Sequence, residues 1–505
     1  MAEIFTMSEG GSSEYCCNIV RVGEIKPIEG SDFLGKTIVN GQSIVVRKDQ
    51  VHEGNVFFYA SNECQLNEKF LSVNNLFDIS SYELNSNSAE VKKLLDSSNN
   101  TFDAAERKKF RQEAKKKVGL FNKHGRVRMI RLRKVPSYGF LFSIDEMAKY
   151  CPKVKEVKLD EYINKDFDTV DGELFVKAYI PFVPEKENTN NLKRYRKAQK
   201  RIDRFDRMVS GEFVLHYKTE LLGKNMWRIT PNTVVTITNK LHGTSAIFSR
   251  VKTRVPIKLP FYKKIWNRFV DTTGMFTKAR ITDYRIDYGN VYSSRTVIKN
   301  KYINNGVNEG FYGIDVWAEY NELLKDKIPD GMTVYGEIIG YLSGSDKMIQ
   351  KQYDYGCEVG RNKFMPYRIT SSFEDGTKYE WNVIEVEQWT EKLIKDYPEI
   401  KDRIEFIHIL YHGTLGNLYP DIDVSNHWHE NVLEALKNDK ERFGMELNEP
   451  LCKNKVPREG IVLRIHGDKH AEAFKLKTDA FYGKEQKEID AGNVDMEMQD
   501  TFCEN

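Results

Sequence analysis

The sequence predicts an α+β fold, in which a β-rich N-terminal part precedes a larger domain of strands and helices. Two observations favour this class. Between residues 17 and 59, short segments of alternating polar and apolar residues are separated by turns that contain Gly, Asp or Asn, which predicts a small barrel. Beyond residue 210, strands rich in β-branched residues alternate with helical segments such as residues 381–395 and 430–437.

The composition describes a globular chain without a strong overall charge. Its 505 residues suffice for two or three domains, and 77 basic against 74 acidic residues leave a net charge of only +3. Binding to an anionic partner must therefore depend on local basic patches. No apolar run has the length of a membrane span, and the N-terminus lacks the basic and apolar regions of a signal peptide. The seven cysteines show no Cys-x-x-Cys spacing, so neither a disulfide framework nor a zinc site is expected.

Lys240 is the residue around which the larger domain is organised. The alternation of residues 233–238 predicts a strand that ends near Lys240, and Gly243 marks a tight turn or a close approach of the backbone to a ligand. A lysine at a strand end either holds a phosphate as a point charge or attacks phosphorus after losing its proton. Most lysines are simply solvated, so a site requires further groups that converge on this one.

Three later strand patterns contribute such groups. Two apolar strands contain or follow a carboxylate, and a third strand carries two lysines on one face, because side chains alternate with a period of two. The residues concerned are Glu337, Glu459, Lys475 and Lys477. Together with Lys240, they predict a site that binds an anion and a metal ion.

The order of these residues resembles the covalent nucleotidyltransferase superfamily, which comprises DNA ligases, RNA ligases and mRNA capping enzymes. The similar motifs are Lys-x-His-Gly from Lys240, Tyr-Gly-Glu ending at Glu337, Glu-Gly-Ile-Val-Leu-Arg from Glu459 and Lys-Leu-Lys from Lys475. Ser-Ser-Arg at residues 293–295 and Pro-Tyr-Arg at residues 366–368 make the chain most similar to ATP-dependent RNA ligases. Within these it resembles the phage and Naegleria-type branch, which has an N-terminal oligonucleotide-binding (OB) domain.

The resemblance implies a fold and a domain layout. The expected fold is an ATP-grasp-like nucleotidyltransferase domain of antiparallel sheets with helices, preceded by an all-β OB-fold barrel. The expected parts are a flexible tail at residues 1–13, an OB-fold RNA-binding domain at 14–150, a basic connecting region at 151–210, the nucleotidyltransferase (adenylation) domain at 211–487 and an acidic tail at 488–505.

The resemblance also implies what each site residue does. The expected catalytic residues are Lys240, Glu337, Glu459, Lys475 and Lys477. The residues expected at the nucleotide are Lys240, Asn239, Arg295, Glu337, Tyr367, Lys475 and Lys477, with Tyr367 stacked on adenine. The residues expected at the metal ion are Glu459, Glu337 and His242. His242 and Asn239 stand where many relatives have Asp and Glu.

The implied reaction uses ATP and Mg²⁺ or Mn²⁺ to join RNA 3′-OH and 5′-phosphate ends. Lys240 attacks the α-phosphate of ATP to give lysyl-AMP, the adenylate passes to the RNA 5′-phosphate, and the RNA 3′-hydroxyl then displaces AMP. The expected role is RNA repair of nicked duplexes or broken ends. We expect a cytoplasmic location, of the host cell if the chain is phage-encoded, with no membrane and no obligate protein partner.

Basic residues in the N-terminal part predict contacts with RNA. Residues 126–133 predict a further strand of the barrel, in which arginines alternate with apolar residues. Such a row suits a phosphate backbone, although a charged sheet face without a ligand is the alternative. The arginines are Arg126, Arg128, Arg131 and Arg133. Further basic segments occur at residues 102–118, 193–201 and 254–268.

Three other functions stay open as alternatives. They are a non-catalytic RNA-binding protein on a ligase fold, a ligase that acts on DNA/RNA hybrid ends, and a capping-type guanylyltransferase. About twenty-eight residues follow Lys477, which are too few for the C-terminal OB barrel of common DNA ligases and capping enzymes. A non-catalytic protein predicts the loss of the motif lysine or a motif glutamate, and none is lost.

Overall fold

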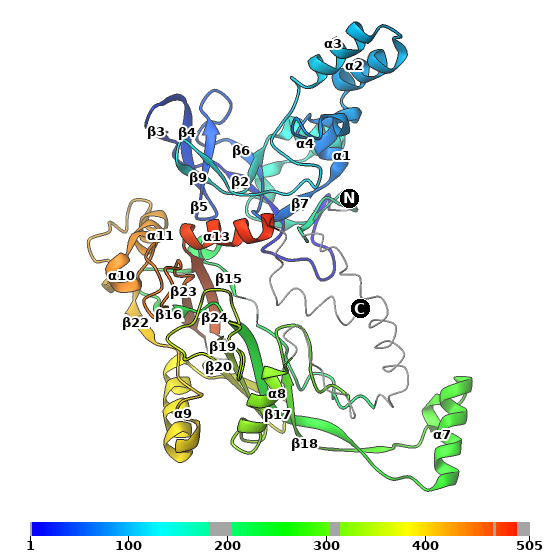
Figure 1. Cartoon of the computed structure of the whole chain (residues 1–505), viewed down its shortest axis with the longest axis vertical. Coiled ribbons are helices and arrows are strands. Elements are labelled where there is room, and N and C mark those ends of the chain that lie inside the picture. Colours follow the sequence, from blue (N-terminus) through cyan, green and yellow to red (C-terminus); the bar gives the residue numbers. More distant parts are fainter. Residues whose placement is uncertain (1–2, 181–204, 218, 303–313, 468–470, 492–505) are drawn as a thin grey trace. The chain divides into compact units, whose positions relative to one another are not determined.

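The computed structural model describes residues 3–180, 205–217, 219–302, 314–467 and 471–491 (Figure 1). The chain divides into two compact units. The first unit comprises residues 1–182 and 220–227, and the second comprises residues 183–219 and 228–505. Both contain helices and antiparallel sheets, as the α+β prediction requires. The predicted basic run at residues 193–201 lies outside the described residues.

The first unit consists of small antiparallel sheets. Its strands are β1 (Phe5–Thr6), β2 (Cys17–Arg21), β3 (Lys26–Ile28), β4 (Ser31–Val39), β5 (Gln42–Arg47), β6 (Val56–Ala60), β7 (Cys64–Leu66), β8 (Ile130–Leu132), β9 (Val135–Ser137), β10 (Phe140–Phe142), β11 (Asp166–Phe167), β12 (Thr169–Val170), β13 (Glu173–Leu174), β14 (Val176–Ala178) and β15 (Glu220–Leu221). The larger sheets have the strand orders β10-β6-β2-β11 and β3-β4-β5. The four strands that the sequence predicts between residues 18 and 59 correspond to β2, β4, β5 and β6.

Helices of the first unit occur mainly between β7 and β11. They are α1 (Glu68–Val73), α2 (Ala89–Asn100), α3 (Ala104–Ala114), α4 (Ile144–Tyr150) and α6 (Leu222–Asn225). Asp103 caps α3, since its carboxylate accepts the backbone N–H of Ala105. The basic side chains of α3 are exposed, as the prediction for residues 102–118 requires.

The first compact unit extends beyond the predicted N-terminal domain, residues 14–150, on both sides. Residues 1–13 are not entirely a tail, because β1 pairs with β12 and Phe5 packs on Phe167 with ring centroids 4.8 Å apart. Part of the predicted connecting region belongs to the first unit, because β11 pairs with β2 and β14 pairs with β7. Burial of aromatic residues such as Phe167 and Phe175 explains why these short strands join the core.

The predicted single strand at residues 126–133 is also wrong. Only β8 is a strand there, and it forms a hairpin with β9 through a turn at Arg133 and Lys134, both of which have positive φ. Arg126 is buried, and its guanidinium lies 2.7 Å from the Glu63 carboxylate, so it is not part of an exposed row. Arg128, Arg131 and Arg133 are exposed.

Two antiparallel sheets form the framework of the second unit. In the first, which we call the lysine sheet, four strands pair in the order β24-β23-β16-β22. These strands are β16 (Val234–Lys240), β22 (Ile409–Thr414), β23 (Gly460–His466) and β24 (Ala471–Lys477). In the second, which we call the long sheet, the strands pair in the order β18-β17-β19-β20-β21. These strands are β17 (Thr244–Pro256), β18 (Tyr284–Ser293), β19 (Met332–Gly340), β20 (Asn362–Ser372) and β21 (Lys378–Glu380). A three-residue turn, 241–243, connects β16 of the first sheet to β17 of the second.

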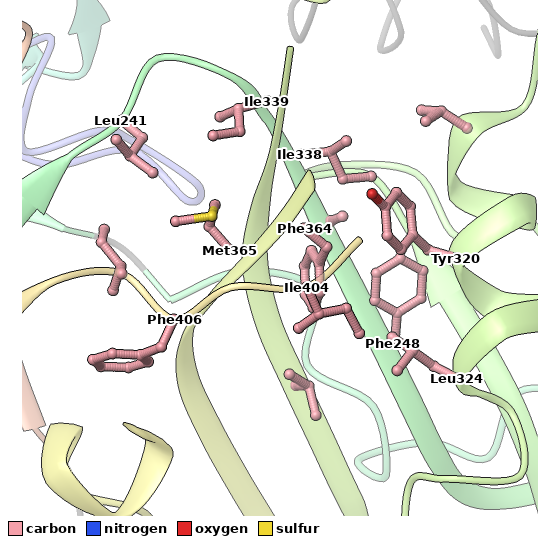
Figure 2. Close-up of a cluster of buried hydrophobic side chains, with 14 of the residues drawn as sticks. Leu241, Phe248, Tyr320, Leu324, Ile338, Ile339, Phe364, Met365, Ile404 and Phe406 are labelled. Carbon is pink, nitrogen blue, oxygen red and sulfur yellow. The ribbon is translucent and has the colours of Figure 1, made fainter. Parts of the chain in front are cut away.

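The long sheet and helices α8 (Val316–Leu324) and α9 (Val383–Asp396) enclose the main core of this unit, to which Phe481 of α13 (Asp479–Asp490) also belongs. Other helices of the unit are α7 (Phe261–Thr273), α10 (Leu415–Leu418), α11 (Trp428–Asn438) and α12 (Lys440–Phe443). Figure 2 shows Phe248 of β17, Tyr320 of α8 and Phe364 of β20 packed together. Phe248 and Phe364 meet edge to face, with ring centroids 5.0 Å apart. Leu241, in the turn after Lys240, belongs to the same cluster, so this core fixes the end of β16.

The helical predictions for the second unit are confirmed, with changed ends. The predicted helices at 381–395 and 430–437 correspond to α9 and α11. The basic segment at 254–268 ends β17 and begins α7, which lies between the far ends of β17 and β18 (Figure 1). Helix α13 continues past the predicted domain end at residue 487. None of the helices in the described ranges has the length and apolarity of a membrane span.

Candidate active site

Lys240 and Lys477 lie on either side of Gly460 in the lysine sheet. Gly460 of β23 is paired with Lys240 of β16 on one edge and with Lys477 of β24 on the other. Gly460 has a φ of 147°, and an added Cβ would lie 2.0 Å from the Leu476 carbonyl oxygen, so only glycine fits there. The side chains of directly paired residues lie on the same face of a sheet, so the side chains of Lys240 and Lys477 lie on one face on either side of Gly460, which has no side chain.

Glu459 is the anion between these two lysines. Its Oε1 lies 2.7 Å from Lys240 Nζ and 3.7 Å from Lys477 Nζ. The carboxylate is almost fully buried, with 3% of its side-chain surface exposed. Burial alone would raise the pKa of Glu459, but the charges of Lys240 and Lys477 outweigh it and hold the pKa below its ordinary value. Glu459 is therefore ionised at neutral pH.

Helix α13 completes the surroundings of Lys477. Glu485 of α13 lies 2.8 Å from Lys477 Nζ. Burial alone would lower the pKa of Lys477, but Glu485 and Glu459 raise it well above its ordinary value. Thr478 caps α13 by accepting the N–H of Phe481 and donates its hydroxyl to the Arg458 carbonyl, which fixes the helix to the segment that carries Glu459.

Glu337 and Gln350 hold the turn that follows Lys240. The Gly243 N–H donates to Glu337 Oε1 at 3.1 Å, and the Gln350 side chain donates to the Gly243 carbonyl at 2.8 Å. An added Cβ on Gly243 would lie 2.4 Å from the Ile338 carbonyl oxygen. Gly243 was expected at a tight turn or at a close approach to a ligand; in the structure, its turn lies close to the backbone of β19.

His242 lies in an aromatic environment. Its ring meets Tyr353 and Phe481 edge to face, each with centroids 5.0 Å apart, and its backbone N–H donates to the Tyr355 hydroxyl at 2.7 Å. Burial, and then the charges of Lys484 and the site lysines, lower the pKa of His242 to about 4. The imidazole is therefore neutral at neutral pH.

The acidic groups of the site suit a metal ion that is held mainly by a phosphate ligand and water. Within the described ranges, no group of three or more His, Cys, Asp or Glu side chains is arranged to bind a metal. However, Glu459 Oε2 is buried and has no hydrogen-bond partner. Mg²⁺ commonly binds through one or two carboxylates, substrate phosphates and several waters, so one such oxygen fits this mode of binding.

Further polar residues lie on the same face of the lysine sheet. Thr238 pairs with Val462, which pairs with Lys475. Each of these residues is two positions along its strand from the paired residues Lys240, Gly460 and Lys477. Lys475 is buried. Arg464 donates from Nη1 to the Thr238 hydroxyl at 3.1 Å, and its guanidinium lies 5.6 Å from the centre of the Tyr367 ring. Tyr367 is on β20, so this contact connects the two sheets of the second unit.

Two of the residues predicted to bind the nucleotide lie apart from the ion-pair cluster. Strand alternation puts the buried Asn239 side chain on the face of β16 opposite Lys240 and Thr238. Arg295 is exposed in the turn that follows β18, where the Ser294 N–H donates to the Val297 carbonyl. Neither residue belongs to the ion-pair cluster of Lys240, Glu459 and Lys477.

Sequence reasoning missed several residues that support the site. They are Gln350, Tyr355, Arg464 and Glu485. Arg464 is the last residue of the Glu-Gly-Ile-Val-Leu-Arg motif. Because side chains alternate along a strand, its position two residues after Val462 could have indicated that both lie on the same face. No local pattern distinguishes Gln350 or Glu485, since each is defined by a contact with a distant segment.

Comparison with known proteins agrees with this geometry. Residues 233–477 match the model of the RNA ligase family. The matched part is a little under half of the chain and extends from the strand of Lys240 to Lys477.

Solved structures of an RNA ligase from Naegleria gruberi are similar to the chain. The Naegleria gruberi RNA ligase with PPi is 15% identical to this chain, with a TM-score of 0.49. The match covers 94% of this chain and 99% of the ligase chain. A lysine-to-alanine variant of that ligase with ATP and Mn is 15% identical, with a TM-score of 0.49, and covers 93% of this chain and 98% of its own. No curated protein matches the chain in sequence.

Proposed function

We propose that the chain is an ATP-dependent RNA ligase that repairs RNA by joining 3′-OH and 5′-phosphate ends through lysyl-AMP and RNA-adenylate. The observation that carries the proposal is the cluster of Lys240, Glu459 and Lys477 at paired strand ends within the region that matches the RNA ligase family. A lysine that is exposed on one side and held by a buried carboxylate on the other suits a nucleophile that must be both oriented and reachable by a nucleotide.

In the first step, Lys240 Nζ forms a bond to the α-phosphorus of ATP, the bond from that phosphorus to the bridging oxygen breaks, and pyrophosphate leaves. An ammonium has no lone pair for this attack, so Lys240 must first lose a proton. Glu459 is a weak base because its pKa is lowered, and 24% of the Lys240 side chain is exposed, so the proton leaves to solvent. Glu459 keeps the amine in place while this happens.

In the second step, an oxygen of the RNA 5′-phosphate attacks the phosphorus of lysyl-AMP, and the phosphorus–nitrogen bond breaks to release Lys240. In the third step, the RNA 3′-oxygen attacks the phosphorus of the activated 5′-phosphate, its proton leaves to solvent, and AMP departs. Lys475 and Lys477 offset negative charge on the phosphates in each step. Because Glu485 and Glu459 keep Lys477 protonated, its positive charge is present throughout the neutral pH range.

A lysine-to-alanine variant of the Naegleria gruberi RNA ligase was solved with ATP and Mn. A bound Mg²⁺ or Mn²⁺ would offset charge on the nucleotide phosphates here, and Glu459 is the residue we propose to hold it, because Oε2 has no other partner. Glu337 contributes indirectly by holding the turn after Lys240. His242 is neutral and enclosed by aromatic rings, so we assign it to the support of Glu459 and Lys240.

We further propose that the first unit is an OB-type RNA-binding domain. Its support is the exposed set Arg128, Arg131 and Arg133 together with the exposed basic side chains of α3. Such side chains attract a phosphate backbone without reading its sequence. Tyr367 is proposed to stack on adenine, and Arg295 and Asn239 remain proposed nucleotide residues.

Incubation with α-³²P-ATP and magnesium, followed by a denaturing gel, tests the first step. The enzyme is first treated with pyrophosphate to remove any adenylate that is already bound. We expect a labelled protein band that is absent from Lys240→Ala and unchanged in Lys392→Ala, a matched exposed lysine on α9. No band in the wild type would overturn the proposal, and a band formed only with GTP would indicate a capping-type reaction.

A chase with unlabelled RNA tests the later steps. We expect the label to pass to RNA that carries a 5′-phosphate, not to RNA with a 5′-hydroxyl, and sealing to require a 3′-hydroxyl. Substrates with DNA on one side of the break show whether hybrid ends are accepted. Label that stays on the protein with every RNA would exclude the ligase reaction.

A further inference from the structure

Arg464 is a buried arginine that forms no ion pair with a carboxylate of the described residues. Its exposed fraction is 5%, and it points from β23 toward the face that carries Lys240. Nη1 donates to the Thr238 hydroxyl, but Nε is buried and has no hydrogen-bond partner. A buried donor of a charged group is usually satisfied, so an unsatisfied one at a site points to a missing acceptor.

Arg368 shows what a satisfied arginine looks like in the same region. Arg368 Nε donates to Glu380 Oε1 at 2.7 Å, and both side chains are at most 4% exposed. Arg464 has no such carboxylate, and burial together with the nearby Arg368 charge lowers the pKa of Arg464 to about 10. The acceptor that Arg464 lacks is therefore not supplied by the described protein groups.

The position of the guanidinium indicates which ligand supplies this acceptor. Arg464 is paired with Thr236, but its side chain reaches Thr238, so it leans along the strand toward Lys240. Thr238 precedes Lys240 by two residues, which is about 7 Å along a strand. A nucleotide whose α-phosphate lies at Lys240 places its ribose over this interval and its base beyond it. The guanidinium lies over the Tyr367 ring, 5.6 Å from its centre, and Tyr367 is the residue proposed above to stack on the base.

We propose that Arg464 reads the nucleobase of the bound nucleotide, by donating Nε–H to a ring nitrogen of the purine that stacks on Tyr367. This inference rests on the proposed function, because it takes Lys240 as the residue at the α-phosphate. Both purines offer ring nitrogens such as N7 as hydrogen-bond acceptors. With Nη1 already bonded to Thr238, the free Nε–H needs a single acceptor, which a purine ring nitrogen supplies.

Three ATP analogues, 1-deaza-ATP, 3-deaza-ATP and 7-deaza-ATP, test this proposal because each lacks one ring nitrogen. The measurement is the concentration of each nucleotide that gives half-maximal labelling of the protein, for the wild type and for Arg464→Met, which keeps the length of the side chain and removes its donors. We expect one analogue to require about 10-fold more nucleotide than ATP in the wild type. In Arg464→Met, ATP itself should require about 10-fold more, and that analogue should no longer differ from ATP.

The comparison of analogues within one variant does not depend on how much of the protein is folded. If Arg464→Met does not fold, Thr238→Val serves instead, since loss of the hydroxyl frees Nη1 and should weaken the penalty on the same analogue. A wild type that is labelled equally by ATP and all three analogues would overturn the proposal for Arg464 and leave the ligase proposal intact. An unchanged penalty in Arg464→Met would do the same. No labelling of the wild type by any nucleotide would instead overturn the proposed function, and this inference with it.

Discussion

Glu459 Oε1 lies 2.7 Å from Lys240 Nζ, although more than two hundred positions separate the two residues in the chain. Lys240 ends β16, and Glu459 directly precedes β23. The contact exists because Gly460, which follows Glu459, is paired directly with Lys240. The antiparallel register of β16 and β23 therefore determines which carboxylate faces the lysine.

Glu459→Gln tests the role of this carboxylate. It removes the negative charge between Lys240 and Lys477 while keeping the shape of the side chain, so the two ammonium groups repel each other and lose their common partner. We expect protein adenylylation to fall by about 100-fold, which is typical when a positioned charged group is lost from a site. Glu472→Gln, a carboxylate on β24 that is half exposed, is the matched control and should retain full labelling. Equal labelling of the wild type and Glu459→Gln would contradict the assigned role.

Gly243→Ala tests the turn after Lys240. The new Cβ would lie 2.4 Å from the Ile338 carbonyl oxygen, so the turn or β19 must shift. We expect a loss of about 1–3 kcal/mol in the free energy of unfolding and a clear fall in adenylylation. Urea denaturation and the labelling assay measure the two effects. Gly23→Ala is the control, because a Cβ there meets no atom within 4 Å and its φ is not positive. A variant at Gly243 with wild-type stability would show that the turn is not constrained.

His242 predicts an acid-sensitive stability. Its pKa in the folded state is about 4, against about 6.5 in the unfolded chain, so between these values the unfolded state binds more protons. The contribution of His242 is complete above pH 6.5 and is lost as the pH falls toward 4, by at most about 1.4 kcal/mol per pH unit. His242→Phe should flatten the fall of the unfolding free energy over this window. His408→Phe, at a largely exposed position, should leave the slope as it is.

The buried pair of Arg368 and Glu380 should dominate local stability near the proposed base site. Arg368→Met leaves the Glu380 carboxylate buried without its cation, which costs about 3–5 kcal/mol in comparable pairs. The exposed pair of Lys392 and Asp396 is the control, and Lys392→Ala should cost less than about 1 kcal/mol. Urea denaturation of both variants measures the difference. Equal costs for the two pairs would contradict the importance of burial.

RNA binding by the first unit predicts a change in salt dependence. Arg128, Arg131 and Arg133 are exposed, so their joint replacement by Ala should weaken binding of single-stranded RNA without affecting protein adenylylation. If all three contact phosphates, the slope of log affinity against log salt should decrease by about 2. Arg47→Ala, at an exposed position on β5 where Arg47 already pairs with Asp49, is the control. An unchanged slope would place the RNA elsewhere.

Local patterns predicted the strands of the second unit well. The strand before Lys240, the interrupted strand of Glu337 and the strand after Glu459 are β16, β19 and β23. These segments succeed because period-two alternation and β-branched residues favour one conformation whatever their neighbours are. The strand predicted at residues 126–133 failed because Arg126 turns inward to Glu63, and no local pattern indicates a buried ion pair with a residue 63 positions away.

The sequence by itself determined which charged residues this protein has and that they stand at strand ends, because alternation and motif order are local properties. Only the tertiary structure decided that Gly460 separates Lys240 from Lys477, that α13 brings Glu485 to the site, and that Arg464 reaches Thr238 and Tyr367. These contacts join segments that are far apart in the chain. They depend on the register of paired strands and on the packing of a shared core, and neither is encoded in any single segment.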